Sequence, residues 1–294
     1  MISIIEKIKN NKVLLSDGAW GTSLQKMGLE VGSCPEKWNF DHPEKVKQVA
    51  REFIEAGSQL VKTNSFGGSR FKLEGYGLAG QAYEINKQAA ALSREVAGDD
   101  IYVLASIGPS GKMILTGEVT PDELYEAFKE QAMALEEGGA DVILVETMTD
   151  LEEAKLAVKA AKENTNCVVA ATMTFSKDFE GDYKTMMGIS ISDMVPVLKE
   201  AGASLIGSNC GNGIKEMIDL VKTIRSMDDQ VPVVIHANAG MPEYQDGETV
   251  FPETPDEMAG SIKDIVDAGA NIIGGCCGTT PEHIRKMKEV LKNL

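Results

Sequence analysis

Three cysteines in this 294-residue chain are placed where they could share one metal ion. Cys276 and Cys277 are adjacent in the segment Gly-Gly-Cys-Cys-Gly-Thr-Thr-Pro, and Cys210 lies upstream in Gly-Ser-Asn-Cys-Gly. Neighbouring cysteines form a disulfide only under strain, but both can turn toward a single ion, and Cys210 can supply a third thiolate. Three protein ligands leave one position of a zinc tetrahedron open, which is typical of catalytic rather than structural zinc.

Other roles fit these cysteines less well. A redox pair would show a Cys-x-x-Cys spacing, which is absent, and an iron–sulfur cluster usually takes four thiolates, for which only Cys34 could be the fourth. We expect Cys34 to be a bystander in a loop, and Cys167, in the run Cys-Val-Val-Ala-Ala, to be a small core residue. His236 could be a fourth ligand, although a core or supporting role is more common for a single histidine at a strand end.

A repeating order of strand and helix must position these residues. Apolar, β-branched runs alternate with amphipathic segments, several of which open with Thr-Pro-acid and end at Gly. Eight such pairs predict a single (β/α)8 TIM barrel over residues 1–294, with residues 2–9 as a plug at its bottom. A doubly wound open sheet is the alternative, but its Gly-x-Gly-x-x-Gly turn is absent. The expected strands are 13–17, 59–63, 102–107, 142–147, 167–174, 204–208, 232–236 and 271–274, and the expected helices are 43–55, 81–96, 121–137, 150–162, 192–201, 214–226, 254–268 and 281–291.

Chemistry in such barrels gathers at the carboxyl ends of the strands. The three cysteines lie there, by an argument independent of their spacing. The carboxylates of Asp17 and Glu146 end the first and fourth expected strands, and a buried carboxylate is costly unless it meets a cation. Turn chemistry for Asp17 and a lysine partner for Glu146 are the ordinary explanations. A substrate ammonium held by both is the functional one.

Two further residues at this rim complete a predicted amino-acid pocket. Gly18 would expose backbone N–H groups to a substrate carboxylate. Asn238 follows the seventh expected strand, and its side-chain oxygen could take the fourth metal position when no substrate is bound.

Composition excludes several classes of partner. The net charge is −16 and no basic stripe occurs, which argues against nucleic acid and anionic membrane surfaces. The first residues are too few and too charged for a signal peptide, and no apolar run is long enough to span a bilayer. Five cysteines without a regular framework favour a reducing compartment, so we expect a cytoplasmic protein.

The motifs together resemble the homocysteine S-methyltransferase family, in particular the homocysteine-binding barrel of cobalamin-dependent methionine synthase. The resemblance covers essentially the whole chain, and its last motif is the most specific. It departs at 211–213, Gly-Asn-Gly, where relatives carry bulkier residues, and at Ala237, where proline is common; both lie beside the expected metal. The matching segments are Asp-Gly-Ala-Trp-Gly-Thr at 17–22, Thr-Asn-Ser-Phe-Gly at 63–67, Ile-Gly-Pro at 107–109, Val-Glu-Thr at 145–147, Asn-Cys at 209–210, Asn-Ala-Gly at 238–240 and Gly-Gly-Cys-Cys-Gly-Thr-Thr-Pro at 274–281.

This resemblance implies zinc on Cys210, Cys276 and Cys277, and homocysteine held through its amino group by Asp17 and Glu146. The reaction implied is methyl transfer to the substrate thiol, giving methionine, with zinc keeping that thiol ionised. The chain stops soon after the last expected helix, so the methyl donor would come from outside, first of all as a methylated corrinoid (methylcobalamin) on a separate protein.

Several alternatives stay open at this point. The donor could be a small sulfonium or betaine compound, and the thiol could differ from homocysteine. A zinc hydrolase is a rival class, although hydrolytic zinc usually has histidine and carboxylate ligands. A non-catalytic protein that binds zinc or a thiol is another.

Overall fold

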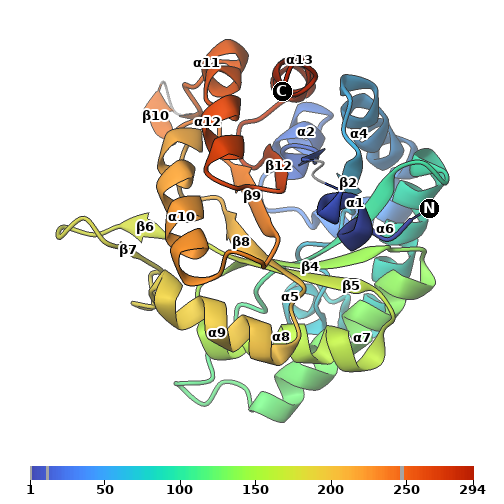
Figure 1. Ribbon diagram of the computed structural model, residues 1–294. Coiled ribbons are helices and arrows are strands. Elements are labelled where there is room, and N and C mark those ends of the chain that lie inside the picture. The colour runs from blue at the N-terminus through green and yellow to red at the C-terminus, as the bar shows by residue number, and fades with distance from the viewer. Residues whose placement is uncertain (1, 11–12, 246–247) are drawn as a thin grey trace.

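The computed structural model describes every residue except 1, 11, 12, 246 and 247. Eight parallel strands form one sheet, in the order β1-β12-β9-β8-β5-β4-β3-β2, and the helices surround it (Figure 1). The expected (β/α)8 TIM barrel is confirmed, and each of the eight expected strands is present. They are β1 (Leu14–Leu15), β2 (Leu60–Lys62), β3 (Tyr102–Ile107), β4 (Val142–Met148), β5 (Val168–Met173), β8 (Leu205–Asn209), β9 (Val233–Ala237) and β12 (Ile272–Gly275).

The last seam of the barrel, between β1 and β2, is not a continuous ladder. The Gln59 N–H donates to the carbonyl of Leu15 at 2.7 Å, and the Gln59 side chain accepts from the Leu15 N–H at 3.2 Å. Further along, the N–H of Lys62 donates to a carboxylate oxygen of Asp17 at 2.7 Å. A side chain therefore replaces a backbone carbonyl in closing the barrel, at the end of the strands where the predicted site lies.

Helices follow the strands nearly as expected, and within the described residues none is both long and apolar enough to cross a membrane. The helix expected over 254–268 is divided in two at Ser261, and two antiparallel hairpins, β6–β7 and β10–β11, were not expected. The helices are α1 (Ile4–Lys9), α2 (Trp20–Lys26), η1 (Pro35–Lys37), α3 (Trp38–Asp41), α4 (Pro43–Ala56), α5 (Arg70–Glu74), η2 (Ala79–Gln81), α6 (Ala82–Ala97), α7 (Pro121–Glu137), α8 (Leu151–Asn164), α9 (Ile191–Ala201), α10 (Ile214–Met227), α11 (Pro255–Gly260), α12 (Ile262–Asp267) and α13 (Pro281–Leu291); the hairpins comprise β6 (Ser176–Lys177), β7 (Tyr183–Lys184), β10 (Glu243–Gln245) and β11 (Glu248–Val250).

The Thr-Pro openings of three helices are caps, as the sequence predicts. Thr120 and Thr254 each accept a hydrogen bond from the third helical N–H, and the carboxylate at that third position accepts from the N–H of the threonine. At Thr280 the partner is His283, whose Nδ1 lies 3.1 Å from the threonine nitrogen. Such reciprocal capping satisfies two N–H groups that a helix start otherwise leaves unpaired.

Apolar side chains fill the barrel in two regions. One lies between the sheet and the surrounding helices, and the other lies inside the lower barrel. Ile4 and Ile8 of α1 pack into this inner cluster, and the hydroxyl of Tyr102 donates to the carbonyl of Ile2 at 2.8 Å. The first helix therefore closes the amino-terminal end of the barrel, as predicted, and the opposite end remains for chemistry.

Candidate metal centre

The three cysteines converge at the carboxyl-terminal rim of the barrel. Cys210 directly follows β8, and Cys276 and Cys277 directly follow β12. Their sulfur atoms lie within 4.8 Å of one another, and the Sγ atoms of Cys210 and Cys277 are 3.7 Å apart. Zinc–sulfur bonds of about 2.3 Å in a tetrahedron place sulfur atoms roughly 3.8 Å apart, so the spacing fits this ion. All three residues are free thiols of intermediate exposure.

A network of backbone bonds fixes the two loops that carry these thiols. The N–H of Cys210 donates to the carbonyl of His236 at 3.0 Å, and that of Cys276 donates to the carbonyl of Ala237 at 2.7 Å. The N–H of Cys277 donates to the side-chain oxygen of Asn238 at 3.1 Å. Strand β9, between β8 and β12 in the sheet, therefore holds both loops in register.

The backbone at Cys210 is strained. Its φ of 61° lies in the left-handed region, which non-glycine residues rarely adopt, and the next residue, Gly211, continues there with a φ of 71°. A Cβ atom on Gly211 would lie 2.7 Å from the carbonyl oxygen of Phe175, so only glycine fits. This glycine is one of the departures noted in the sequence. It allows the turn that directs the thiol of Cys210 toward the other two.

The thiols also stabilise a negative charge among themselves. Hydrogen bonds from Cys276 and Cys277 lower the pKa of Cys210 to about 3, while their own pKa values are raised by donating to it. Thiolate character is what a metal ligand needs, because metals bind the deprotonated form. The cluster therefore carries a negative charge, which favours the binding of a cation.

A cavity of about 380 Å³ opens beside the cysteines. All three line it, together with Gly18 and Glu146, so the structure brings five of the seven predicted site residues to one space. Trp20, Phe66 and Ser106 contribute to the walls. A volume of this order accommodates a small substrate.

Glu146 is buried at the end of β4, with 5% of its surface exposed. It accepts a hydrogen bond from the hydroxyl of Ser106, and burial raises its pKa to about 7, with Lys62 limiting the rise. The next residue, Thr147, has a φ of 62° and donates its N–H to Asn209 at 2.8 Å. A second non-glycine residue in this rare conformation thus lies beside the cavity, and strain of this kind gathers at functional sites.

Asp17 occupies a different position from Glu146. Its side chain is fully buried, and it is not among the residues that line the cavity. One carboxylate oxygen accepts from the indole of Trp20 at 2.6 Å and from the N–H of Lys62 at 2.7 Å. The other accepts from Ser16 at 3.3 Å and lies 3.5 Å from the Lys62 ammonium. The sequence predicts a substrate contact here, whereas in the structure its partners are groups of the chain itself.

Asn238 and His236 lie beneath the rim. Asn238 is 3% exposed and does not line the cavity, and its oxygen is engaged by Cys277. His236 is fully buried, and among the described residues it does not join the cysteines in the group of potential metal ligands. Burial and then Lys62 hold the pKa of His236 well below its usual range. A supporting role within the barrel therefore describes both residues better than direct metal binding.

Four residues of the site were not singled out from the sequence. Lys62 lines the cavity, and Ser106 contacts Glu146. Asn209 bridges Thr147 and the Cys276 sulfur, which lies 3.9 Å from its amide nitrogen. Thr279 accepts from the N–H of Ala19 at 3.1 Å and donates to Cys276 at 2.7 Å, joining the first and last loops. A charged residue ending an apolar strand was the available signal for Lys62.

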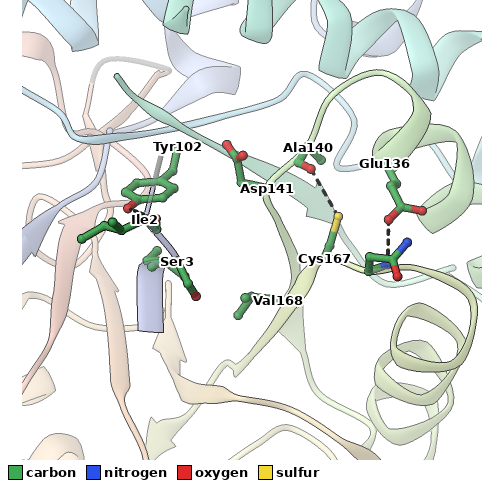
Figure 2. A pocket seen from close by; sticks show the side chains of 10 residues that line it. Ile2, Ser3, Tyr102, Glu136, Ala140, Asp141, Cys167 and Val168 are labelled. Carbon is green, nitrogen blue, oxygen red and sulfur yellow. Dashed lines mark hydrogen bonds between the residues drawn. The ribbon is translucent and has the colours of Figure 1, made fainter. Parts of the chain in front are cut away.

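A second cavity, of about 290 Å³, lies at the opposite end of the barrel near α1. Figure 2 shows Cys167 among its lining residues, with the thiol directed at the carbonyl of Ala140, 3.3 Å away. Burial raises the pKa of Cys167 to about 12, so this thiol is inert, as the apolar run around it predicts. Cys34 lies in a loop, as predicted, and it is also buried, which raises its pKa to about 11. Neither belongs to the metal centre.

Comparison with known proteins identifies relatives along the whole chain. Residues 14–291 match the family model for homocysteine S-methyltransferase. The chain is 31% identical over 302 residues to the methionine synthase of Mycobacterium tuberculosis (strain ATCC 25618 / H37Rv), covering 98% of this chain and 25% of that protein. The methionine synthase of Mycobacterium leprae (strain TN) is 31% identical over 291 residues, which cover 94% of this chain and 24% of that protein. The chain thus spans about a quarter of the length of these curated relatives.

A solved structure supports the same fold. The metallated form of the homocysteine methyltransferase MmuM from Escherichia coli superposes with a TM-score of 0.81 at 21% identity, covering 98% of this chain and 99% of that one. The family model matches nearly the whole chain, and both curated relatives are more than 30% identical to it. This chain belongs to the homocysteine S-methyltransferase family.

Proposed function

We propose that this protein transfers a methyl group to the thiol of homocysteine, giving methionine, at a zinc ion held by Cys210, Cys276 and Cys277. The observation that carries the proposal is the convergence of three sulfurs on the cavity that also contains Glu146. Zinc bound there would lower the pKa of the substrate thiol and hold its sulfur at the open coordination position. Three thiolates make zinc a weaker Lewis acid, which favours this role over hydrolysis.

The chain itself supplies binding and orientation. Glu146, buried beside the cavity, is placed to accept the substrate ammonium, and Gly18 borders the same space. In the reaction the sulfur–methyl bond forms as the bond between the methyl group and its donor breaks, and the thiol proton leaves to solvent. No side chain has to deliver a proton to the methyl group, so positioning is the main contribution of the protein.

For the methyl donor we propose a methylated corrinoid on a separate protein, and small sulfonium or betaine compounds are the alternatives. The resemblance to methionine synthase barrels supports the corrinoid, as do the relatives that bear that name. We retain two further predictions from the sequence, a cytoplasmic location and a single-domain organisation. The five free cysteines are in keeping with a reducing compartment.

The test is direct. Zinc-loaded protein is incubated with homocysteine and a panel of donors that includes methylcobalamin, S-methylmethionine and betaine, and methionine is measured, with metal content determined in parallel. We expect one zinc per chain and methionine from at least one donor. Cys210→Ala should lose both, whereas Cys167→Ala, the matched cysteine outside the centre, should lose neither. Activity and full metal content in Cys210→Ala would refute the site, and zinc binding without methyl transfer would favour a binding protein.

A further inference from the structure

Lys62 is a buried cation in the wall of the substrate cavity. It is the last residue of β2, only 5% of its surface is exposed, and it lines the cavity together with the cysteines. Its ammonium group lies 3.3 Å from the carbonyl of Gly275 and 3.5 Å from a carboxylate oxygen of Asp17. A buried lysine is costly unless paired, so its position at this site requires an explanation.

Both carboxylate oxygens of Asp17 already have partners within the chain. A carboxylate oxygen accepts about two hydrogen bonds. One oxygen already has Trp20 and the Lys62 N–H, and the other has Ser16 and the Lys62 ammonium. The arrangement in which Asp17 holds an ammonium is therefore present in the structure, but the ammonium belongs to the chain.

The ammonium group of Lys62 keeps hydrogen-bonding capacity. An ammonium group has three donors, and the two partners found among the described residues are both beyond 3.2 Å, longer than the usual charge-assisted bond. Burial opposes its charge, but the carboxylates of Asp17 and then Glu146 outweigh burial and raise the pKa of Lys62, so it stays protonated. Among the described residues that line the cavity it is the one cation.

The two carboxylates of the cavity lining differ in how many hydrogen bonds they accept. Glu36 accepts the N–H of Gly67 at 2.6 Å and the thiol of Cys34 at 3.4 Å. Among the described residues, Glu146 accepts one hydrogen bond, from Ser106. The cavity wall beside the three sulfurs thus contains one cation and one carboxyl group with unused acceptor capacity, and such a pair, with the carboxyl ionised, complements an amino-acid zwitterion.

We propose that Lys62 binds the anionic group of the thiol substrate, and that Asp17 is a positioning residue that holds Lys62 rather than the substrate ammonium. This inference rests on the proposed zinc-dependent thiol chemistry. The substrate class is a short thiol with a carboxylate or a similar anion at the far end. Homocysteine fits through its carboxylate at Lys62 and its ammonium at Glu146, and a thiol without an amino group fits as well.

Four thiols of matched length separate the contributions of the substrate carboxylate and the substrate ammonium to binding. Homocysteine has both charged groups, 4-mercaptobutanoate lacks the ammonium, 3-mercaptopropan-1-amine lacks the carboxylate, and 1-propanethiol lacks both. Binding to zinc-loaded protein is measured by calorimetry, and the thiolate-to-cobalt absorption of the cobalt-loaded protein reports sulfur ligation independently. For the unaltered protein we expect 4-mercaptobutanoate to bind at least tenfold more tightly than 1-propanethiol.

Variants then test whether Lys62 is the residue that binds the substrate carboxylate. Lys62→Met should lower the affinity for homocysteine and for 4-mercaptobutanoate at least tenfold, and it should change the affinity for 3-mercaptopropan-1-amine by less than threefold. Lys159→Met, at an exposed position of α8 that does not line the cavity, removes the same charge and should change the affinity for none of the four thiols. Because Lys62→Met leaves Asp17 without its partner, the Asp17→Asn/Lys62→Met double variant is measured beside it and should show the same loss of selectivity.

The outcomes are distinct. If all four thiols ligate the metal but the carboxylate gives no gain in affinity, the role of Lys62 is refuted and the zinc chemistry stands. If the ammonium alone determines affinity, Asp17 and Glu146 bind the substrate and the inference is wrong. If no thiol ligates the metal, the proposed function fails first, and this result is recognised by the unchanged cobalt spectrum.

Discussion

The substitution Asp17→Asn tests the closing seam of the barrel. An asparagine of the same shape must place its NH₂ group at one of the two carboxylate positions. At one position it faces the Trp20 indole and the Lys62 N–H, two buried donors that would each lose an acceptor, at about 1–3 kcal/mol apiece. At the other it faces the buried Lys62 ammonium, and leaving one member of a buried pair alone costs about 3–5 kcal/mol. Across the two orientations the predicted loss is roughly 2–6 kcal/mol.

Urea unfolding followed by circular dichroism measures this loss. With a slope of about 3 kcal/mol per M, the midpoint should fall by roughly 0.7–2 M. Asp267→Asn removes the carboxylate of an exposed pair with Lys263 and is the matched control, for which we expect no resolvable change. Adding Lys62→Met to Asp17→Asn should recover part of the loss, because the unpaired charge is then absent.

Hydrogen exchange locates the effect. The N–H of Lys62 donates to Asp17, so its protection should fall in Asp17→Asn, while the N–H of Leu104, inside β3, should keep its protection relative to the new global stability. A midpoint for Asp17→Asn equal to that of Asp267→Asn would contradict the reasoning. In that case the carboxylate would not be a structural part of the seam.

Three further predictions concern the site. Because burial raises the pKa of Glu146 to about 7, the affinity for homocysteine relative to 4-mercaptobutanoate should rise from about pH 6 to about pH 8 and stay constant in Glu146→Gln. Taking this ratio cancels the effect of pH on the thiol itself. A ratio independent of pH in the unaltered protein would count against the contact between Glu146 and the substrate ammonium. Gly207→Ala would place a Cβ atom 1.7 Å from the carbonyl oxygen of Val234, so we expect a loss of at least about 1–3 kcal/mol in urea unfolding, whereas Gly260→Ala, with open space around it, should lose nothing. Chelation of the metal should lower the thermal midpoint of the unaltered protein but not of Cys277→Ala, and equal shifts in both would exclude Cys277 as a ligand.

Most of the fold could be predicted because the strands of a closed parallel barrel are buried on both faces. Such strands are short apolar runs, and the Thr-Pro and Gly signals around them define the helices. The same architecture explains why three distant cysteines could be predicted to meet, since parallel strands all end at one rim. The division of one helix at Ser261 and the two hairpins have no comparable signal, because they depend on local loop packing.

The arrangement around Asp17 could not be predicted for a different reason. A carboxylate at the end of an apolar strand shows that a cation is needed, but not which one. Lys62 is 45 residues away, and the two meet only because the barrel closes between β1 and β2. Likewise, the left-handed backbone at Thr147 and Cys210 follows from contacts of the finished structure. Neither residue type indicates it in advance.

The seam has a thermodynamic consequence for the protein as a whole. Lys62 joins β2 to Asp17 through its main chain, and its side chain lines the cavity, so the proposed anion site would share one residue with the closure of the barrel. Linkage is reciprocal: if an anion at the Lys62 ammonium tightens the junction of β1 and β2, then a tighter junction raises the affinity for that anion by the same factor. Under the proposal, the stability of the junction between β1 and β2 should therefore respond to substrate binding.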